Sequence, residues 1–223
     1  MYPADFLDVI EVAADYHRFT EVMLSQALDF TIKARSLTDE WCPVAVNIGS
    51  MSFLDRSLPE RLQVLLDAHG IPGHVLTLEV TESELLDEDG ADLPVFDAIK
   101  SLGVRLSIDD FGTGYSSLTR LRALDVDEVK IDRAFVEGLG RSPEDEIIVQ
   151  AVVELARLLG HSVVAEGVET REQAHMLRGY GCTIGQGYFF SRPQPPASLL
   201  NTIRDGQIYD VAAPAVQQRV SRS

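Results

Sequence analysis

Two adjacent carboxylates, Asp109 and Asp110, end an apolar segment of the chain and precede a glycine-rich one. Apolar and polar residues alternate over 104–108, which predicts a strand that stops at these charges. Gly112 and Gly114 then allow the backbone to adopt positive φ and to approach a ligand closely. The same residue types also favour a capped turn. The pair alone therefore leaves two interpretations open, a ligand-binding loop and a simple turn.

The same arrangement recurs along the chain, because six short β-rich segments each reach a polar side chain near their end. We expect strands at 42–48, 75–83, 104–110, 128–133, 161–169 and 183–190. Their polar residues are Asn47, Glu79, Asp109 with Asp110, Lys130, Glu166 and Gln186. Strands that alternate with helices form a parallel sheet, and the carboxyl ends of the strands of a (β/α) barrel form its active face. We therefore expect these side chains to converge at one mouth.

Helices with one apolar face are expected around these strands, from the spacing of apolar residues and from residues typical of helix ends. The expected ranges are 4–16, 20–35, 57–70, 93–103, 142–160, a helix that begins at Thr170, and 197–204. Thr170 and Gln173 resemble a capping box. We expect one domain over residues 1–205, followed by a disordered tail at 206–223, because the last residues are polar and show no periodicity.

The expected site is rich in oxygen donors. Carboxylate and amide oxygens suit Mg²⁺, Mn²⁺ or Ca²⁺, and the lack of His or Cys among them argues against zinc. Asp109 and Asp110 could bridge two ions or divide between them, and a metal pair is a usual means of activating water in phosphodiester cleavage. Lys130 could orient or deprotonate the attacking water, or it could balance the charge of the acids.

The amino-acid composition limits which binding partners and which cellular location we expect. The 223 residues include 19 Lys and Arg against 35 Asp and Glu, a net charge of −16, which argues against binding long nucleic acids or anionic membranes. No apolar segment approaches the ~18 residues that span a bilayer, and the first residues lack the features of a secretory signal. We therefore expect a cytoplasmic protein in which Cys42 and Cys182 are reduced core thiols.

Several longer motifs resemble a known family. The segments VNIGS, LEVTES, IDDFGTGYSSL, VKIDRAFV, VVAEGVET and QGYFFSRPQP, in this order, resemble the EAL domain, the bacterial phosphodiesterase that linearises cyclic di-GMP to pGpG. The match covers about residues 3–197. The resemblance implies a TIM-type (β/α) barrel, cyclic di-GMP as ligand, a pair of Mg²⁺ or Mn²⁺ ions, and a homodimer with its contact near the glycine loop.

The resemblance also implies a role for each polar residue that matches a family motif. The implied metal ligands are Asn47, Glu79, Asp109, Asp110 and Glu166. Lys130 would lie near the attacking water and would form the catalytic group together with Asp110 and Glu166. Gln186 and Asp132 would lie near the substrate. The residues that would anchor or form the glycine loop are Glu82, Glu169, Gly112 and Gly114.

One departure from the family pattern bears on activity. The first residues, YPADFL, look like the helix that follows the second strand of the family barrel, and the Glu-Ala-Leu triplet that names the family does not occur. We therefore expect an incomplete barrel of about six of eight strands, with impaired catalysis. We also expect an exposed apolar barrel interior that favours association with a second copy, or with a segment that completes the barrel.

Two alternatives remain at this stage. The chain could be a non-catalytic module that binds cyclic di-GMP or a protein through the remaining face. It could also be an unrelated acid-lined barrel enzyme of the enolase type, but the segment DDFGTGYSSL argues against this interpretation.

Overall fold

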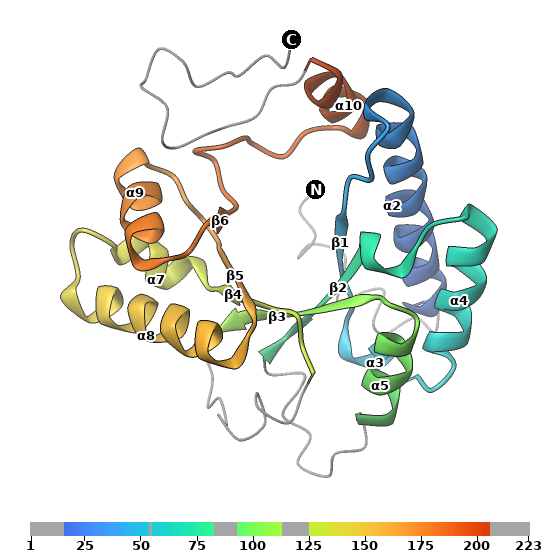
Figure 1. The fold of residues 1–223 in the computed structure, drawn as a ribbon, viewed down its shortest axis with the longest axis horizontal. Helices are drawn as coiled ribbons and strands as arrows, with labels where there is room; N and C mark the ends of the chain where they lie inside the picture. The colour runs from blue at the N-terminus through green and yellow to red at the C-terminus, as the bar shows by residue number, and fades with distance from the viewer. Residues whose placement is uncertain (1–15, 54, 83–92, 113–124, 206–223) are drawn as a thin grey trace.

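The six strands form one curved parallel sheet with helices along its outer side (Figure 1). In this computed structural model the described residues are 16–53, 55–82, 93–112 and 125–205. The strands pair in the order β1-β2-β3-β4-β5-β6. Their bounds are β1 Val44–Asn47, β2 Leu76–Thr81, β3 Arg105–Phe111, β4 Glu128–Ile131, β5 Ser162–Ala165 and β6 Ile184–Gly185. This half-barrel confirms the expected incomplete TIM-type architecture.

Helices of unequal length connect the strands. Their bounds are α2 Tyr16–Thr38, α3 Ser50–Phe53, α4 Leu58–His69, the 3₁₀ helix η2 Gly73–Val75, α5 Leu93–Ser101, α7 Arg133–Gly138, α8 Pro143–Leu159, α9 Arg171–Tyr180 and α10 Pro196–Arg204. The helix expected at 20–35 is the middle of α2, and α10 packs against α2 (Figure 1). The short helices α3 and α7 were not expected. The helix expected at 4–16 and the tail at 206–223 fall almost wholly outside the described residues.

The ends of the longer helices follow the sequence signals. The Ser142 hydroxyl accepts a hydrogen bond from the backbone N–H of Asp145, and Gly160 ends α8 in the left-handed conformation. The capping box of Thr170 and Gln173 is present at the start of α9. These signals are local, which explains why they could be recognised without knowledge of the fold.

The sixth strand is much shorter than expected, because the segment after Gly185 turns away from the sheet. The Val168 N–H donates to the Gln186 carbonyl at 3.0 Å, and the Phe189 N–H donates to the Val168 carbonyl at 2.9 Å. Gly187 has φ of 155°, and a Cβ added there would lie 2.2 Å from the Val168 oxygen. The close approach of two backbones at a glycine thus replaces the strand expected over 186–190.

The apolar core lies between the sheet and the helices, and the inner face of the sheet is mostly polar. Alternate residues such as Leu78 and Ile131 belong to the buried core. On the opposite face the Ser107 and Ser162 hydroxyls donate to Glu128, at 3.1 and 3.3 Å. The expected apolar interior is therefore wrong for the described strands, because strand alternation places the apolar side chains outward, under the helices.

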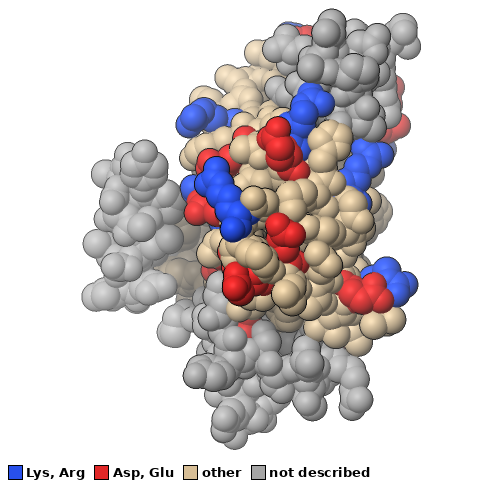
Figure 2. Space-filling view, turned by 90° about the vertical axis from the view of Figure 1, so that its left-hand side faces the viewer, with Lys and Arg blue, Asp and Glu red and all other residues tan. Residues whose placement is uncertain are grey.

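The surface that carries α7, α8 and α9 shows both signs of charge. Figure 2 views the molecule from the left-hand side of Figure 1, and there acidic and basic side chains are interspersed over a largely uncharged surface. The surplus of acidic residues therefore does not form a single acidic patch on this face. None of the helices within the described ranges is long and apolar enough to cross a bilayer.

Candidate active site

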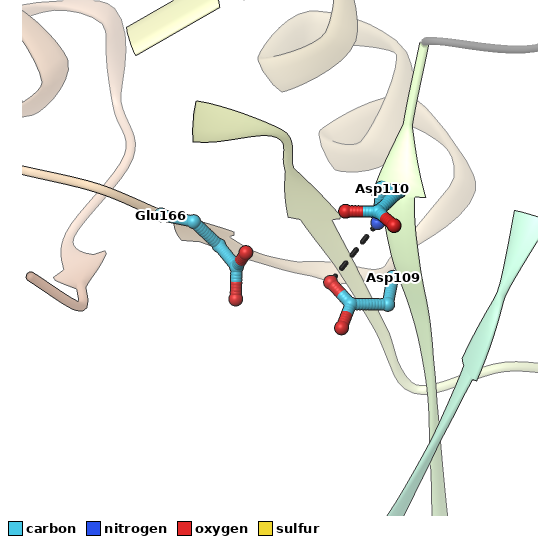
Figure 3. A group of neighbouring side chains, drawn as sticks. All are labelled: Asp109, Asp110 and Glu166. Atoms are coloured by element: carbon cyan, nitrogen blue, oxygen red, sulfur yellow. Dashed lines mark hydrogen bonds between the residues drawn. The ribbon is translucent and has the colours of Figure 1, made fainter. Parts of the chain in front are cut away.

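Three carboxylates meet at the carboxyl end of the sheet. Asp109 and Asp110 lie in β3 just before its last residue, Phe111, and Glu166 follows β5 directly. One oxygen from each lies within 4.8 Å of the others, and Figure 3 shows the three side chains around one space. Carboxylate oxygens at this separation are the donors that Mg²⁺, Mn²⁺ and Ca²⁺ prefer. The donor set therefore fits a hard divalent cation.

Lys130 lies beneath this group and joins it to the neighbouring strands. Its side chain is 3% exposed. The Nζ atom lies 3.0 Å from a Glu79 oxygen, 3.0 Å from an Asp109 oxygen and 2.6 Å from a Glu166 oxygen. Because these acids come from β2, β3 and the end of β5, one buried cation holds three strands' carboxylates together.

The protonation of this ion cluster follows from burial and charge together. Burial alone would lower the pKa of Lys130, but the hydrogen bond to Glu166 and the charges of Glu79 and Asp109 outweigh it, so that the pKa lies above its ordinary value. Burial raises the pKa of Glu79, and the pairing with Lys130 only partly offsets that rise. In the metal-free protein Lys130 is therefore a fixed positive charge.

Asp110 has an unusual backbone and a strongly perturbed carboxyl group. Its φ is 55°, in the left-handed region, and its backbone N–H donates to Asp109 Oδ1 at 3.0 Å, the dashed line in Figure 3. Burial, the charge of Asp109, and a hydrogen bond to Asp132 raise the pKa of Asp110 from 3.8 to about 6. This crowding of acids is relieved when a cation or a proton is present.

Asp110→Asn should therefore make the metal-free protein more stable at pH 7 and should change its stability little at pH 4. The carboxyl group of Asp110 keeps its proton up to about pH 6 in the folded protein, whereas in the unfolded chain it loses the proton near pH 3.8. The contribution of this group to the free energy of unfolding therefore falls as pH rises through that interval. Asn tolerates the left-handed backbone. Urea unfolding in EDTA at both pH values measures the effect, with exposed Asp97→Asn as the control. Equal stability of variant and wild type at pH 7 would contradict the perturbed carboxyl.

The remaining predicted ligand and substrate residues lie around this cluster at different depths. Gln186 Nε2 donates to Glu166 Oε1 at 3.4 Å. Asn47 is exposed at the end of β1 and pairs in register with Glu79. Asp132 lies one residue beyond β4, and its carboxylate caps α7 by accepting from the Ala134 N–H at 2.7 Å. Of these three, Gln186 contacts the acidic group through Glu166, and Asp132 contacts it through its hydrogen bond with Asp110.

The predicted loop anchors lie in two places. Glu82 is buried and accepts a hydrogen bond from the backbone N–H of Gly112 at 2.8 Å, where the glycine segment begins. Glu169 instead pairs with Arg133 at 3.2 Å. Gly112 has φ of 98°, as its position in a turn requires, and Gly114 lies outside the described residues.

Two features of the site were missed from sequence. Arg133 was read as the end of a strand, although it begins α7 and contacts the loop that carries Glu166. The hydrogen bond between Asp110 and Asp132 was also missed. An Asp followed by helix-compatible residues is a helix-start signal that could have placed Arg133 in a helix, but no sequence signal indicated the contact between Asp110 and Asp132.

Comparison with known proteins decides the family. The EAL domain model matches residues 1–193. The chain belongs to the EAL domain family. The cyclic di-GMP phosphodiesterase NbdA of Pseudomonas aeruginosa is 43% identical over 171 residues, which is 77% of this chain and 22% of NbdA. This chain spans about a quarter or less of the length of the first curated relatives.

Solved EAL structures share the fold. The MucR phosphodiesterase in complex with cyclic di-GMP is 36% identical, with a TM-score of 0.83 over 89% of this chain and 81% of that one. The manganese and cyclic di-GMP complex of BlrP1 from Klebsiella pneumoniae is 33% identical, with a TM-score of 0.72 over 82% of this chain and 46% of that one. The same protein has also been solved as a calcium complex.

Proposed function

We propose that this EAL domain binds cyclic di-GMP with divalent cations and hydrolyses it to pGpG, and that this chain by itself is catalytically impaired. The observation that carries the proposal is the meeting of Asp109, Asp110 and Glu166 above a buried lysine. The named relatives and the complexes of MucR and BlrP1 support the ligand.

In the proposed site, Asp109, Asp110 and Glu166 hold the cations, with Glu79 and Asn47 as further ligands at the ends of the neighbouring strands. We propose Mg²⁺ or Mn²⁺ in a pair. Such cations polarise the phosphodiester and lower the pKa of the attacking water. The protein supplies converging negative charge that is poorly compensated without them, as the raised pKa of Asp110 indicates.

Lys130 then orients the ligands and the attacking water. Its raised pKa argues against the role of general base and favours a fixed positive charge that keeps three carboxylates facing one another. Gln186 and Asp132 are proposed to contact the substrate, Gln186 from beside Glu166. The bond from Gly112 to Glu82 supports the proposed anchoring of the glycine loop, for which Glu169 is the second candidate.

A non-catalytic cyclic di-GMP-binding or protein-interaction module is the second candidate, and for this chain taken alone it is favoured because residues 1–223 hold no Glu-Ala-Leu triplet. Within the described sheet, β1 and β6 each pair with one strand. We therefore propose that a second copy or a further segment pairs with these edges.

The expected cytoplasmic location stays a prediction.

Mn²⁺ should stabilise the fold if the three carboxylates hold it. At a Mn²⁺ concentration of ~100 Kd, binding to the native state alone adds about 2.7 kcal/mol to the free energy of unfolding. Asp109→Asn should remove this gain, whereas Asp97→Asn, an exposed change on α5, should keep it. Thermal unfolding with Mn²⁺ and with EDTA is the measurement, and identical curves for the wild type would exclude the metal site.

Calorimetric titration with cyclic di-GMP, followed by analysis of the products, separates the two candidates. A bound ligand recovered as pGpG indicates the phosphodiesterase. A bound ligand recovered intact, in the presence of Mn²⁺, indicates the binding module. No binding with Mn²⁺ present would count against both.

A further inference from the structure

The loop that carries Glu166 closes over the side chain of Arg133. This loop, residues 166–169, runs from β5 toward α9, and Arg133 is the first residue of α7 after β4. Gly167 has φ of 65°, and a Cβ added to it would lie 2.3 Å from Arg133 Cγ and 2.9 Å from Cδ. The methylene groups of Arg133 therefore occupy the space that any side chain at residue 167 would need.

The guanidinium group of Arg133 adds polar contacts to the packing of its stem. Nη2 lies 3.2 Å from Glu169 Oε1, and Nε donates to Glu137, one turn further along α7. The Glu169 N–H in turn donates to the Gln173 side chain at 2.9 Å. The far end of the loop is thus tied to α7 and to α9, while Lys130 holds Glu166 at its near end.

The loop also contacts the backbone of Gln186, the residue that directly follows β6. Val168 is bonded through its backbone to Gln186 and to Phe189, at 3.0 and 2.9 Å. Any displacement of Val168 would therefore move Gln186, whose side chain contacts Glu166. Backbone hydrogen bonds thus connect the residues that follow β5 and β6, and the Arg133 stem lies against Gly167 of this connected segment.

We propose that Arg133 is a positioning residue that holds loop 166–169, and through it Glu166 and Gln186, in the arrangement that binds the metal. It acts through the packing of its stem on Gly167 more than through its charge. The ion pairs of Arg133 are exposed, with 54% of its side chain and 42% of that of Glu169 accessible, and exposed pairs contribute little to stability. The stem instead fills a space against backbone, so its removal leaves the loop unsupported.

Three variants test this proposal, which rests on the proposed metal site. Arg133→Ala removes the stem, Arg133→Met keeps it without the charge, and Arg157→Ala removes an exposed arginine whose pair with Glu154 lies on α8. Amide hydrogen exchange followed by NMR reports the loop, since the Val168 and Glu169 amides are both bonded. Mn²⁺ titration followed by EPR reports the ligand geometry, and neither measurement requires turnover.

For Arg133→Ala we expect the Val168 and Glu169 amides to exchange about tenfold faster and Mn²⁺ affinity to fall about tenfold, the scale on which groups that orient ligands act. Arg133→Met and Arg157→Ala should resemble the wild type in both measurements. Unchanged exchange and Mn²⁺ affinity in Arg133→Ala would overturn the proposal. Equal losses in Arg133→Met and Arg133→Ala would overturn the role of the stem.

Failure of the proposed function gives a different pattern. A wild type that binds no Mn²⁺ would overturn the metal site and the positioning of metal ligands with it. The exchange of the Val168 and Glu169 amides would still show whether Arg133 holds the loop, because that measurement is made without metal. The two failures are therefore distinguishable in one set of samples.

Discussion

Lys130→Met should lower the free energy of unfolding of the metal-free protein at pH 7 by ~3–5 kcal/mol, the range for breaking a buried ion pair. The substitution keeps the volume of the side chain but removes the cation that lies within 3.0 Å of Glu79, Asp109 and Glu166. Three carboxylates would then face one another in a largely buried site. Urea unfolding in EDTA measures the loss.

The pH dependence of this loss identifies its cause. Without Lys130 the pKa of Glu79, which burial already raises, rises further, so the folded state of the variant takes up a proton at a higher pH than the unfolded chain does. The stability of the variant should therefore recover as pH falls from about 7 toward 5, and Mn²⁺ should restore part of it. A loss that is independent of pH would indicate that packing was damaged and not charge.

Lys100→Met is the matched control for Lys130→Met. Lys100 pairs with Asp127 at 2.7 Å, but its side chain is 21% exposed and that of Asp127 is 27% exposed. A partly hydrated pair of this kind is worth about 1 kcal/mol or less. Similar losses of stability in the two variants would contradict the view that removal of Lys130 leaves buried carboxylates without a compensating charge.

The position of the site was predictable because each strand gives a local signal where it ends. In β2 and β4, apolar residues alternate with Glu79 and Lys130, and in β3 the pattern stops at Asp109. Parallel strands bring such residues to one edge whatever the helices between them do. The parallel sheet, and the meeting of these side chains at its carboxyl end, therefore followed from sequence alone.

The detailed contacts were not predictable, because they depend on irregular backbone. The register between β3 and β4 shifts between Ile108 and Phe111, and Asp110 within this shift has φ of 55°. A left-handed backbone conformation is harder to predict at an aspartate than at a glycine, because glycine adopts it far more often. This irregularity leaves Asp110 beside Asp132 and Asp109 beside Lys130, pairs that an ideal strand register would not have indicated.

The error about the inner face has a related origin. The interior of a typical TIM barrel is filled with branched apolar side chains, which favoured the expectation of an apolar interior. In this chain the inward positions include Thr77, Ser107 and Glu128, and the apolar alternates lie under the helices. The polar face reduces the drive for nonspecific association. Among the described strands, β1 and β6 each pair on one side only, and their other edges are the stronger reason to expect a partner strand.

This chain alone should hydrolyse cyclic di-GMP at least ~100-fold more slowly than the same chain fused to a segment that supplies a Glu-Ala-Leu strand, the scale for losing groups that position a metal. The resemblance assigns a metal ligand to that Glu, and the triplet is absent from the sequence. The proposed ligands of this chain, Asp109, Asp110 and Glu166, already lie close together, so the added strand has to supply one further ligand and a pairing partner for the sheet.

Formation of pGpG with Mg²⁺ and with Mn²⁺ is the measurement for the chain alone, for the fusion, and for the fusion with its added Glu changed to Gln. Rescue by the intact fusion, lost in its Gln variant and in Glu166→Gln, would show that the site needs a further carboxylate and uses those of this chain. Full activity of the chain alone would refute the idea. Rescue by both fusions would mean that closing the sheet edges, and not the added ligand, restores the geometry of Glu166 and Lys130.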